Sequence, residues 1–279
     1  DLELAQEIDK VAREIGIKAK IHLKLDTGMS RLGYVVLDDK LDEIADEIKQ
    51  ISQFEGIILE GMYTHFATAD ARNKEFENLQ THRFSEMVDK VKDMGVNIEY
   101  IHCSNSAEIL DCDEKYDMVR PGIIQYGIYP SNEVSYSIDI KPVMTFKAKV
   151  SNVKVLDAGT SISYGRVYFT TVREKIISIA AGYADGFLRG RRNPYVYING
   201  VKCSIVGRIC MDQCMVRVPI DMDVKVNDDV VIFGDDLVSV DDVARGCDTI
   251  AHEVMCMMSR RVPRVYYRHG EIVSIVDYL

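Results

Sequence analysis

The spacing of apolar residues changes once along this chain, and that change constrains the fold more than any other feature. In the first part, short apolar runs alternate with segments of helical spacing such as Leu41, Ile44 and Ile48. From about residue 136, strand-like runs follow one another without helices between them. We therefore expect an α/β domain at 1–135 and a mainly β-stranded domain at 136–279.

The first domain is expected to contain a parallel sheet, because strands that alternate with helices form βαβ units. Helices are predicted over 2–15, 41–51 and 76–91, with a short helix from Asn105; strands are predicted over 21–25, 56–63, 98–103 and 118–120. A closed β/α barrel needs eight such units. The four units predicted here cannot close, so the predicted fold class is half of a (β/α)8 barrel, which the family resemblance described below makes the C-terminal half, followed by a β-rich domain.

The second domain carries a strong hairpin signal. Strands are predicted over 147–155, 175–180 and 195–198. Asn199-Gly200 separates the last of these from another apolar run, and this dipeptide favours a two-residue turn with left-handed backbone.

Composition excludes several classes of protein. A net charge of −10 argues against a nucleic-acid partner, and no apolar run is long enough to span a membrane. The acidic, helical N-terminus does not resemble a signal peptide. Seven cysteines without a Cys-x2-Cys pair are typical of reduced thiols in a cytoplasmic protein, and no metal site is expected.

Short polar and glycine-containing motifs lie at strand ends in both domains. They are Lys24-Leu25-Asp26-Thr27-Gly28-Met29-Ser30-Arg31-Leu32-Gly33, Tyr63-Thr64-His65-Phe66-Ala67, Ser104-Asn105-Ser106, Val119-Arg120-Pro121-Gly122, Gly159-Thr160-Ser161-Ile162-Ser163-Tyr164-Gly165 and Arg208-Ile209-Cys210-Met211-Asp212-Gln213. In order and spacing they resemble the alanine racemases, which are isomerases that depend on pyridoxal 5'-phosphate (PLP). The resemblance implies interconversion of L- and D-alanine for peptidoglycan precursors, in a cytoplasmic homodimer.

A cofactor phosphate is expected near the ends of the last two predicted strands. Barrels of this kind often bind phosphate there through backbone N–H groups. The resemblance assigns this role to Asn105, Ser106, Gly122 and Ile123, and places Arg120 against the pyridine nitrogen of PLP. An arginine donates a hydrogen bond but does not give up its proton. Arg120 should therefore favour simple proton transfer over transamination or decarboxylation.

Lys24 and Arg31 flank a glycine-containing turn. In the family the arginine is near the substrate carboxylate, and the lysine is often carbamylated (N6-carboxylysine). An unmodified Lys24 would repel Arg31, whereas a carbamate would attract it.

Tyr164 is the expected catalytic base on one face of the substrate, because racemisation at Cα needs a base on each face. In the family the PLP lysine serves the opposite face. A free tyrosine has a pKa of about 10, so a tyrosine base needs neighbours that favour the phenolate. The resemblance assigns this task to His65, which is linked to Arg120.

Met211, Asp212 and Tyr183 complete the expected substrate site. In the family, Met211 presents its backbone N–H to the substrate, and Asp212 organises the loop. Together with Tyr164, these residues act on the cofactor of the partner subunit, so the resemblance implies active sites shared between subunits.

His252 departs from the family pattern, which has a tyrosine in an Asn-Tyr-Glu-Val-like segment. Here the sequence reads Ala251-His252-Glu253-Val254. An imidazole can still donate to the PLP phosphate, but it is smaller. A serine or broad-specificity racemase therefore remains an alternative.

The family's barrel is expected to begin about one hundred residues upstream of this chain. That part would carry the Schiff-base lysine, which is not recognisable here, so we expect residues 1–279 alone to be inactive. A second alternative is a non-catalytic PLP-binding protein. Such proteins lack a C-terminal β domain, which argues against this alternative.

Overall fold

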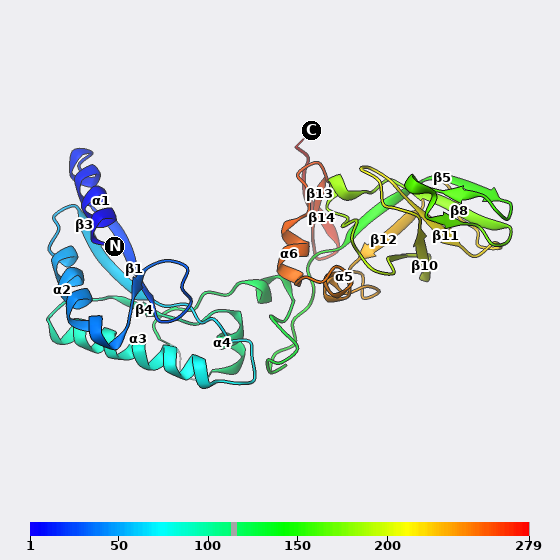
Figure 1. The fold of residues 1–279 in the computed structure, drawn as a ribbon. Coiled ribbons are helices and arrows are strands. Elements are labelled where there is room, and N and C mark those ends of the chain that lie inside the picture. The colour runs from blue at the N-terminus through cyan, green and yellow to red at the C-terminus, as the bar shows by residue number, and fades with distance from the viewer. Residues whose placement is uncertain (113–115, 279) are drawn as a thin grey trace. The chain divides into compact units, whose positions relative to one another are not determined.

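The computed structural model describes residues 1–112 and 116–278, and these form two compact units, Asp1–Lys141 and Pro142–Leu279 (Figure 1). The division lies a few residues after the boundary at 135/136 that the sequence predicts. Each unit is described by itself below.

Unit 1 is built around a parallel sheet in the order β2-β1-β3-β4. Its strands are β1 (Ala19–Asp26), β2 (Tyr34–Val35), β3 (Ile57–Tyr63) and β4 (Tyr100–His102). Its helices are α1 (Leu2–Glu14), α2 (Leu41–Ser52), α3 (Glu75–Asp93) and α4 (Ser106–Asp111), with 3-10 turns η1 (Asp38–Lys40) and η2 (Ile123–Tyr126). The predicted alternation of helices and parallel strands is confirmed.

Burial explains why these elements form. The apolar stripe of α2, which includes Ile44 and Ile48, is buried, and so are Phe84 and Met87 of α3. Met62 of β3 belongs to the same core cluster. The last half of β1 is fully buried, whereas its first half is partly exposed. Lys24 and Asp26 at the carboxyl end of β1, and His102 at the end of β4, are therefore shielded from water.

The strand predicted at 118–120 does not form, which corrects the sequence-based interpretation. The segment runs alongside the end of β4, where Asp117 N donates to Ile101 O (3.0 Å) and Arg120 N donates to Ser104 O (2.9 Å). Pro121 follows immediately and has no N–H to continue the ladder. The result is an extended segment that still delivers Arg120 to the carboxyl end of the sheet.

Unit 2 contains a closed barrel in the strand order β10-β11-β8-β5-β12-β9. The strands are β5 (Phe146–Leu156), β8 (Glu174–Ile179), β9 (Tyr195–Ile198), β10 (Val201–Val206), β11 (Cys214–Val218) and β12 (Asp229–Phe233). The hairpin predicted at Asn199-Gly200 is confirmed: these residues have φ of 49° and 76°, and Val201 pairs with Ile198. Closure leaves the barrel without a free sheet edge.

Shorter elements surround the barrel. They are β6 (Ser161–Ile162), η3 (Tyr164–Arg166), β7 (Tyr168–Phe169), η4 (Tyr183–Asp185), α5 (Val240–Gly246), α6 (Ala251–Cys256), β13 (Arg264–Arg268) and β14 (Glu271–Val276). Within residues 1–112 and 116–278, no helix has the length and apolar character needed to cross a membrane.

Candidate active site

Arg120 is the centre of a polar cluster at the carboxyl end of the sheet in unit 1. Its Nη2 donates to the backbone oxygens of Thr64 (2.9 Å) and Cys103 (3.0 Å), and lies 3.4 Å from Nδ1 of His65. Its Nη1 contacts Nδ1 of His102. Burial lowers the pKa of the guanidinium, but an arginine stays charged at any working pH.

The two histidines beside Arg120 are held in the neutral state. Burial, and then the charge of Arg120, lowers the pKa of His102 to about 4. The pKa of His65 is also below its ordinary value, first because of burial and then because of Arg120 and the other cations of the site. The ring of Tyr63 stacks on His102, with ring centroids 5.0 Å apart.

The turn after β1 is organised by one buried carboxylate. Asp26 accepts hydrogen bonds from the backbone N–H groups of Gly28 (3.0 Å), Ser30 (2.9 Å) and Arg31 (3.1 Å). Burial raises the pKa of Asp26, but these donors and Lys24 outweigh it and bring the pKa below its usual value. The turn therefore holds the backbone of Arg31 in a fixed place near the end of the strand.

Lys24 lies in β1, beside the same turn. Its Nζ donates to the carbonyl of Leu25 (3.0 Å). Burial lowers the pKa of Lys24, Asp26 opposes this, and the charge of Arg31 adds to it. A side chain at Gly33 would overlap the backbone carbonyl of Lys24, so the close approach requires glycine there.

The residues predicted to bind phosphate lie together. Ser106 Oγ accepts a hydrogen bond from Gly122 N (2.9 Å), and Ile123 is the first residue of η2. Asn105 is the N-cap of α4, and its Oδ1 accepts from two backbone N–H groups of that helix, at 3.0 and 3.2 Å. Hydroxyl and backbone N–H donors of this kind suit an anionic group.

In unit 2, Tyr164 lies in a tight turn, as the first residue of η3. Ser163 and Gly165, on either side of it, have φ of 67° and 72°. Ser163 Oγ donates to the carbonyl of Arg208 (2.7 Å) and lies 3.9 Å from Sγ of Cys210. These contacts fix the turn, whereas the side chain of Tyr164 is 69% exposed.

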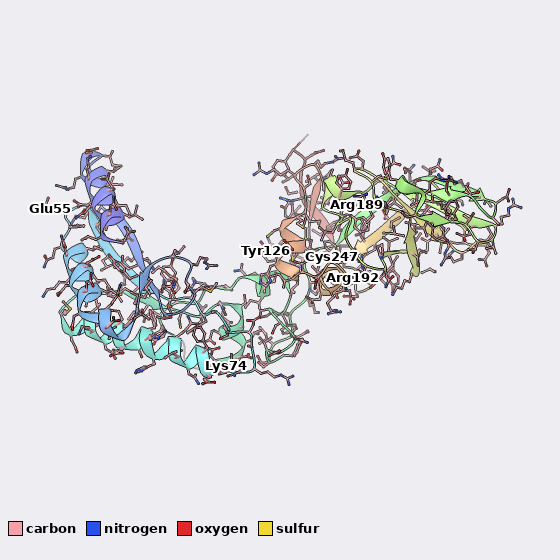
Figure 2. All side chains as sticks on the ribbon, viewed as in Figure 1. Glu55, Lys74, Tyr126, Arg189, Arg192 and Cys247 are labelled. Carbon is pink, nitrogen blue, oxygen red and sulfur yellow. The ribbon has the colours of Figure 1, made fainter. Side chains whose placement is uncertain are left out.

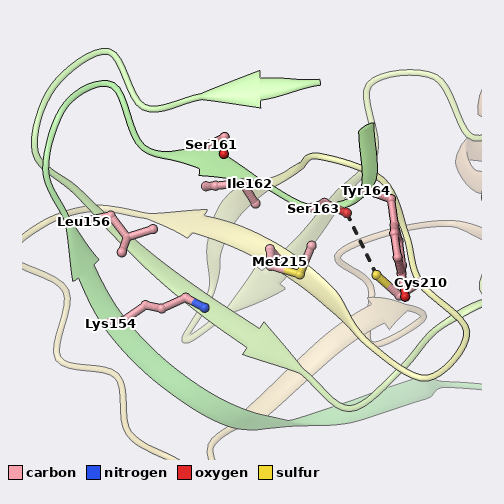
Figure 3. Close-up of a pocket in the computed structure, with 8 residues that line it drawn as sticks. All are labelled: Lys154, Leu156, Ser161, Ile162, Ser163, Tyr164, Cys210 and Met215. Atoms are coloured by element: carbon pink, nitrogen blue, oxygen red, sulfur yellow. Dashed lines mark hydrogen bonds between the residues drawn. The ribbon is translucent and has the colours of Figure 1, made fainter. Parts of the chain in front are cut away.

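Tyr164 borders a cavity of about 400 Å³. Figure 3 shows Tyr164 and Cys210 on one side of this cavity, and Lys154 and Leu156 of β5 across from them. The remaining lining residues are Ser161, Ile162, Ser163 and Met215. A second hollow is lined by Arg189, which is labelled in Figure 2, together with Gly190 and Arg208.

Backbone hydrogen bonds join the Tyr183 turn to the Met211 loop. Tyr183 N donates to Cys210 O and Ala184 N donates to Met211 O, both at 3.0 Å. Any side chain at Gly182 would overlap the carbonyls of Cys210 and Met211. The two predicted substrate-binding residues therefore belong to one rigid backbone unit, although their side chains are exposed.

Arg261 joins the same loops through side chains. Its Nη2 lies 2.7 Å from Asp212 Oδ1, and its Nε lies 3.0 Å from Asp185 Oδ1. His252, the second residue of α6, is exposed and lies close enough to Asp241 to affect the pKa of that carboxyl group.

The predicted residues thus fall into two groups. Unit 1 brings Arg120 beside His65, and Ser106 beside Gly122. Unit 2 joins the loops of Tyr183 and Met211. No hydrogen bond or ion pair links His252 to the residues around Tyr164, among those that the structure describes in unit 2.

Sequence reasoning missed several residues of these clusters. His102 and Tyr63 stand at the ends of β4 and β3, where a search for polar residues at carboxyl ends of parallel strands would find them. Arg261 gave no local signal, because its partners lie far away in the chain.

Comparison with known proteins identifies the family. The model "Alanine racemase, N-terminal domain" matches residues 1–130, and "Alanine racemase, C-terminal domain" matches 143–266. The alanine racemase 2 of Caldanaerobacter subterraneus subsp. tengcongensis is 45% identical over 100% of this chain and 72% of its own.

Solved structures agree with the sequence comparison. The alanine racemase of Clostridium difficile 630 has a TM-score of 0.96 and 45% identity, covering 100% of this chain and 72% of that one. The Bacillus anthracis alanine racemase with bound L-Ala-P has a TM-score of 0.90 and 33% identity, covering 98% and 72%. The Bartonella henselae alanine racemase with covalently bound pyridoxal phosphate has a TM-score of 0.78 and 26% identity, covering 92% and 69%. This chain belongs to the alanine racemase family, whose members are PLP-dependent isomerases.

Proposed function

We propose that this protein interconverts L- and D-alanine by two-base proton transfer, with Tyr164 as one base and with His65 and Arg120 supporting it. The observation that carries the proposal is the cluster around Arg120. A cation that cannot release its proton lies between two neutral imidazoles, in a partly buried site at the carboxyl end of a parallel sheet.

The residues of unit 1 fit PLP. Ser106, Gly122 and Ile123 would hold the phosphate through hydroxyl and backbone N–H donors, with Asn105 shaping the loop. Arg120 would donate to the pyridine nitrogen. When bound, PLP supplies the electron sink that makes the α-proton of alanine removable. Because Arg120 keeps its proton, it would leave the pyridine nitrogen unprotonated and so limit how far negative charge spreads into the ring. This favours simple proton transfer.

His65 is suited to support a phenolate. Arg120 can only donate, so Nδ1 of His65 is the acceptor and Nε2 carries the hydrogen. A neutral imidazole with its N–H directed at the Tyr164 oxygen would stabilise the charged form of the tyrosine.

The exposed residues of unit 2 suit a site shared between subunits. Tyr164, Tyr183 and Met211 present large side chains to solvent on rigid turns. We infer a homodimer in which these residues and Asp212 act at the partner's cofactor. Met211 would present its backbone N–H to the substrate, and Asp212 would organise the loop.

Lys24 is proposed to be an N6-carboxylysine that steers Arg31 to the substrate carboxylate. Its lowered pKa increases the fraction of neutral amine, which is the form that reacts with carbon dioxide. The carbamate would also replace repulsion of Arg31 by attraction.

We further propose that the sheet of unit 1 is part of a β/α barrel and that the enzyme works in the cytoplasm. The base opposite Tyr164 is not assigned to a residue of this chain.

The alternative is a serine or broad-specificity racemase, which His252 favours because it replaces a larger tyrosine at the proposed phosphate contact. The presence of unit 2 argues against a non-catalytic PLP-binding protein, because such proteins lack a C-terminal β domain.

The test is α-proton exchange in deuterated water by the whole protein with PLP present, starting from each enantiomer of alanine and of serine. Exchange from both alanine enantiomers, faster than from serine, is the expected result. Binding of PLP without any α-exchange would support the non-catalytic alternative instead.

A further inference from the structure

A chain of side-chain contacts runs from Arg120 to the surface of unit 1. His102 contacts Arg120 through Nδ1, and its Nε2 lies 2.8 Å from Nδ1 of His22. Nε2 of His22 lies 3.3 Å from Oε2 of Glu60, and Lys20 forms an ion pair with the same carboxylate. The segments involved are β1, β3, the end of β4 and the 118–120 strand-like segment.

The donor directions along this chain are constrained at both ends, by Arg120 and by Glu60. Arginine has only donors, so Nδ1 of His102 must accept and its Nε2 must carry the hydrogen. That hydrogen points at Nδ1 of His22, which must therefore also accept, leaving the hydrogen of His22 on Nε2. The last acceptor is Glu60, whose ionised carboxylate has no hydrogen to donate and can only accept. Lys20 is the main cause that lowers the pKa of Glu60 and keeps it ionised.

The fold makes room for this arrangement. A side chain at Gly61 would overlap the imidazole of His22, so the ring occupies the space that a Cβ would need. The pairing of β1 with β3 shifts register between Ile21 and His22, which places His22 opposite Gly61. Tyr100 stacks on the ring of His22, with centroids 6.3 Å apart. The imidazole is thus held by packing as well as by its hydrogen bonds.

We propose that Glu60 is a positioning residue: it fixes His22 and His102 as Nε2–H tautomers and so holds Arg120 in place as a donor. Without an acceptor at position 60, only the hydrogen bond from Nε2–H of His102 still favours Nε2–H over Nδ1–H in His22, and the hydrogen on Nε2 of His22 has no partner. The Nδ1–H tautomer would bring two donors face to face between the histidines and loosen Arg120. The effect of Glu60 on catalysis rests on the proposed function, but its effect on the tautomers does not.

The experiment compares Glu60→Ala, Glu60→Gln and Glu99→Gln in the PLP-loaded enzyme. Glutamine keeps an acceptor oxygen and serves as the conservative rescue, whereas Glu99 interacts electrostatically with Lys20 and lies outside the chain. Nitrogen-15 NMR of labelled histidines reports the tautomer of each ring. Steady-state kinetics of alanine racemisation and thermal unfolding are measured on the same samples.

In the wild type and in Glu99→Gln, both histidines should show hydrogen on Nε2. Glu60→Ala should convert His22 to a tautomer mixture and lower kcat about tenfold, with KM for alanine changed less than about twofold. Glu60→Gln should restore most of both. If Glu60→Ala does not fold, Glu60→Leu, which keeps the bulk of the side chain but has no acceptor, is compared with Glu60→Gln instead.

Hydrogen on Nδ1 of His102 in the wild type, or unchanged tautomers in Glu60→Ala, would overturn the proposal. So would altered tautomers with an unchanged kcat. A wild type that has the expected tautomers but does not racemise alanine would refute the proposed function and leave the tautomer assignment intact.

Discussion

The two units position their functional groups by opposite means. In unit 1, Lys24, Asp26 and His102 are buried, and their hydrogen bonds and pKa values are set by one another. In unit 2, Tyr164 and Met211 are exposed, and it is the backbone beneath them that is fixed. Unit 1 thus sets the protonation states of buried groups, whereas unit 2 presents exposed groups at its surface.

This contrast predicts how each unit responds to substitution. A buried, hydrogen-bonded charge contributes to stability as well as to chemistry, because its neighbours lose their partners when it is removed. An exposed side chain on a rigid turn contributes mainly to chemistry. Substitutions in unit 1 should therefore change activity and stability together, and those in unit 2 should change activity alone.

Tyr164→Phe should show the largest loss of activity without loss of stability. Removing a catalytic base typically costs a factor of about 10² to 10⁴ in rate. Alpha-proton exchange from one enantiomer should fall much more than exchange from the other, with PLP binding unchanged. Tyr267→Phe is the matched control, because Tyr267 is 66% exposed in the same unit. Equal loss of exchange from both enantiomers would contradict the assignment.

Arg120→Ala should lower both activity and stability. It leaves the carbonyls of Thr64 and Cys103 without this donor, at a cost of about 2 to 4 kcal/mol in the free energy of unfolding. Urea denaturation and racemase assays on one preparation give both quantities. Arg173→Ala, which removes an exposed arginine of unit 2, should change neither. An inactive Arg120→Ala of wild-type stability would break the contrast between the units.

Acid should destabilise unit 1 before unit 2. His102 has a pKa of about 4 when folded and about 6.5 when unfolded. Between these values the unfolded state binds more protons, so stability falls as the pH is lowered from about 6.5 to about 4, by up to about 3 kcal/mol. Hydrogen exchange of β3 and β4 at pH 7 and pH 5, corrected for intrinsic rates, should reveal this. His102→Gln should flatten the dependence.

Lys24 should carry carbon dioxide. With carbon-13 bicarbonate, a single carbamate resonance is expected, and Lys24→Arg should remove it, whereas Lys149→Arg, at an exposed lysine of unit 2, should not. Lys24→Arg should raise KM for alanine several-fold, because Arg31 loses an anionic partner. A carbamate signal that survives in Lys24→Arg would place the modification elsewhere.

His252→Tyr should have the smallest effect. It should raise the preference for alanine over serine, since one hydroxyl in such a pocket is worth about 1 to 3 kcal/mol or less. The ratio of kcat/KM for the two amino acids measures this, with Glu271→Gln on the exposed β14 as a neutral control. An unchanged ratio would mean that other residues shape the pocket.

Local sequence patterns were sufficient to predict the helices and hairpins that depend on neighbouring residues alone. The spacing of Ile44 and Ile48 predicted α2, and Asn199-Gly200 predicted its hairpin. The strand at 118–120 was mispredicted because its apolar residues resemble a strand, whereas Pro121 prevents the ladder from continuing. Arg120 and Ser106 were identified through the family resemblance and lie in the clusters described above.

The parts that sequence could not predict depend on long-range contacts. Glu60 and His22 meet only because β1 pairs with β3 in one register, interrupted by a shift before His22. Arg261 reaches Asp185 and Asp212 from a distant segment. No local pattern encodes such encounters, since each residue alone resembles an ordinary surface charge.

Gly182 has a consequence for engineering this enzyme. The backbone carbonyls of Cys210 and Met211 lie against Gly182, where there is no room for a Cβ. Any substitution of Gly182 would therefore push the Tyr183 turn and the Met211 loop apart. Libraries aimed at new substrates should therefore keep Gly182 fixed and randomise Tyr183 and Met211, whose side chains are exposed. Such libraries would vary the two proposed substrate-binding side chains while the backbone that joins their loops stays intact.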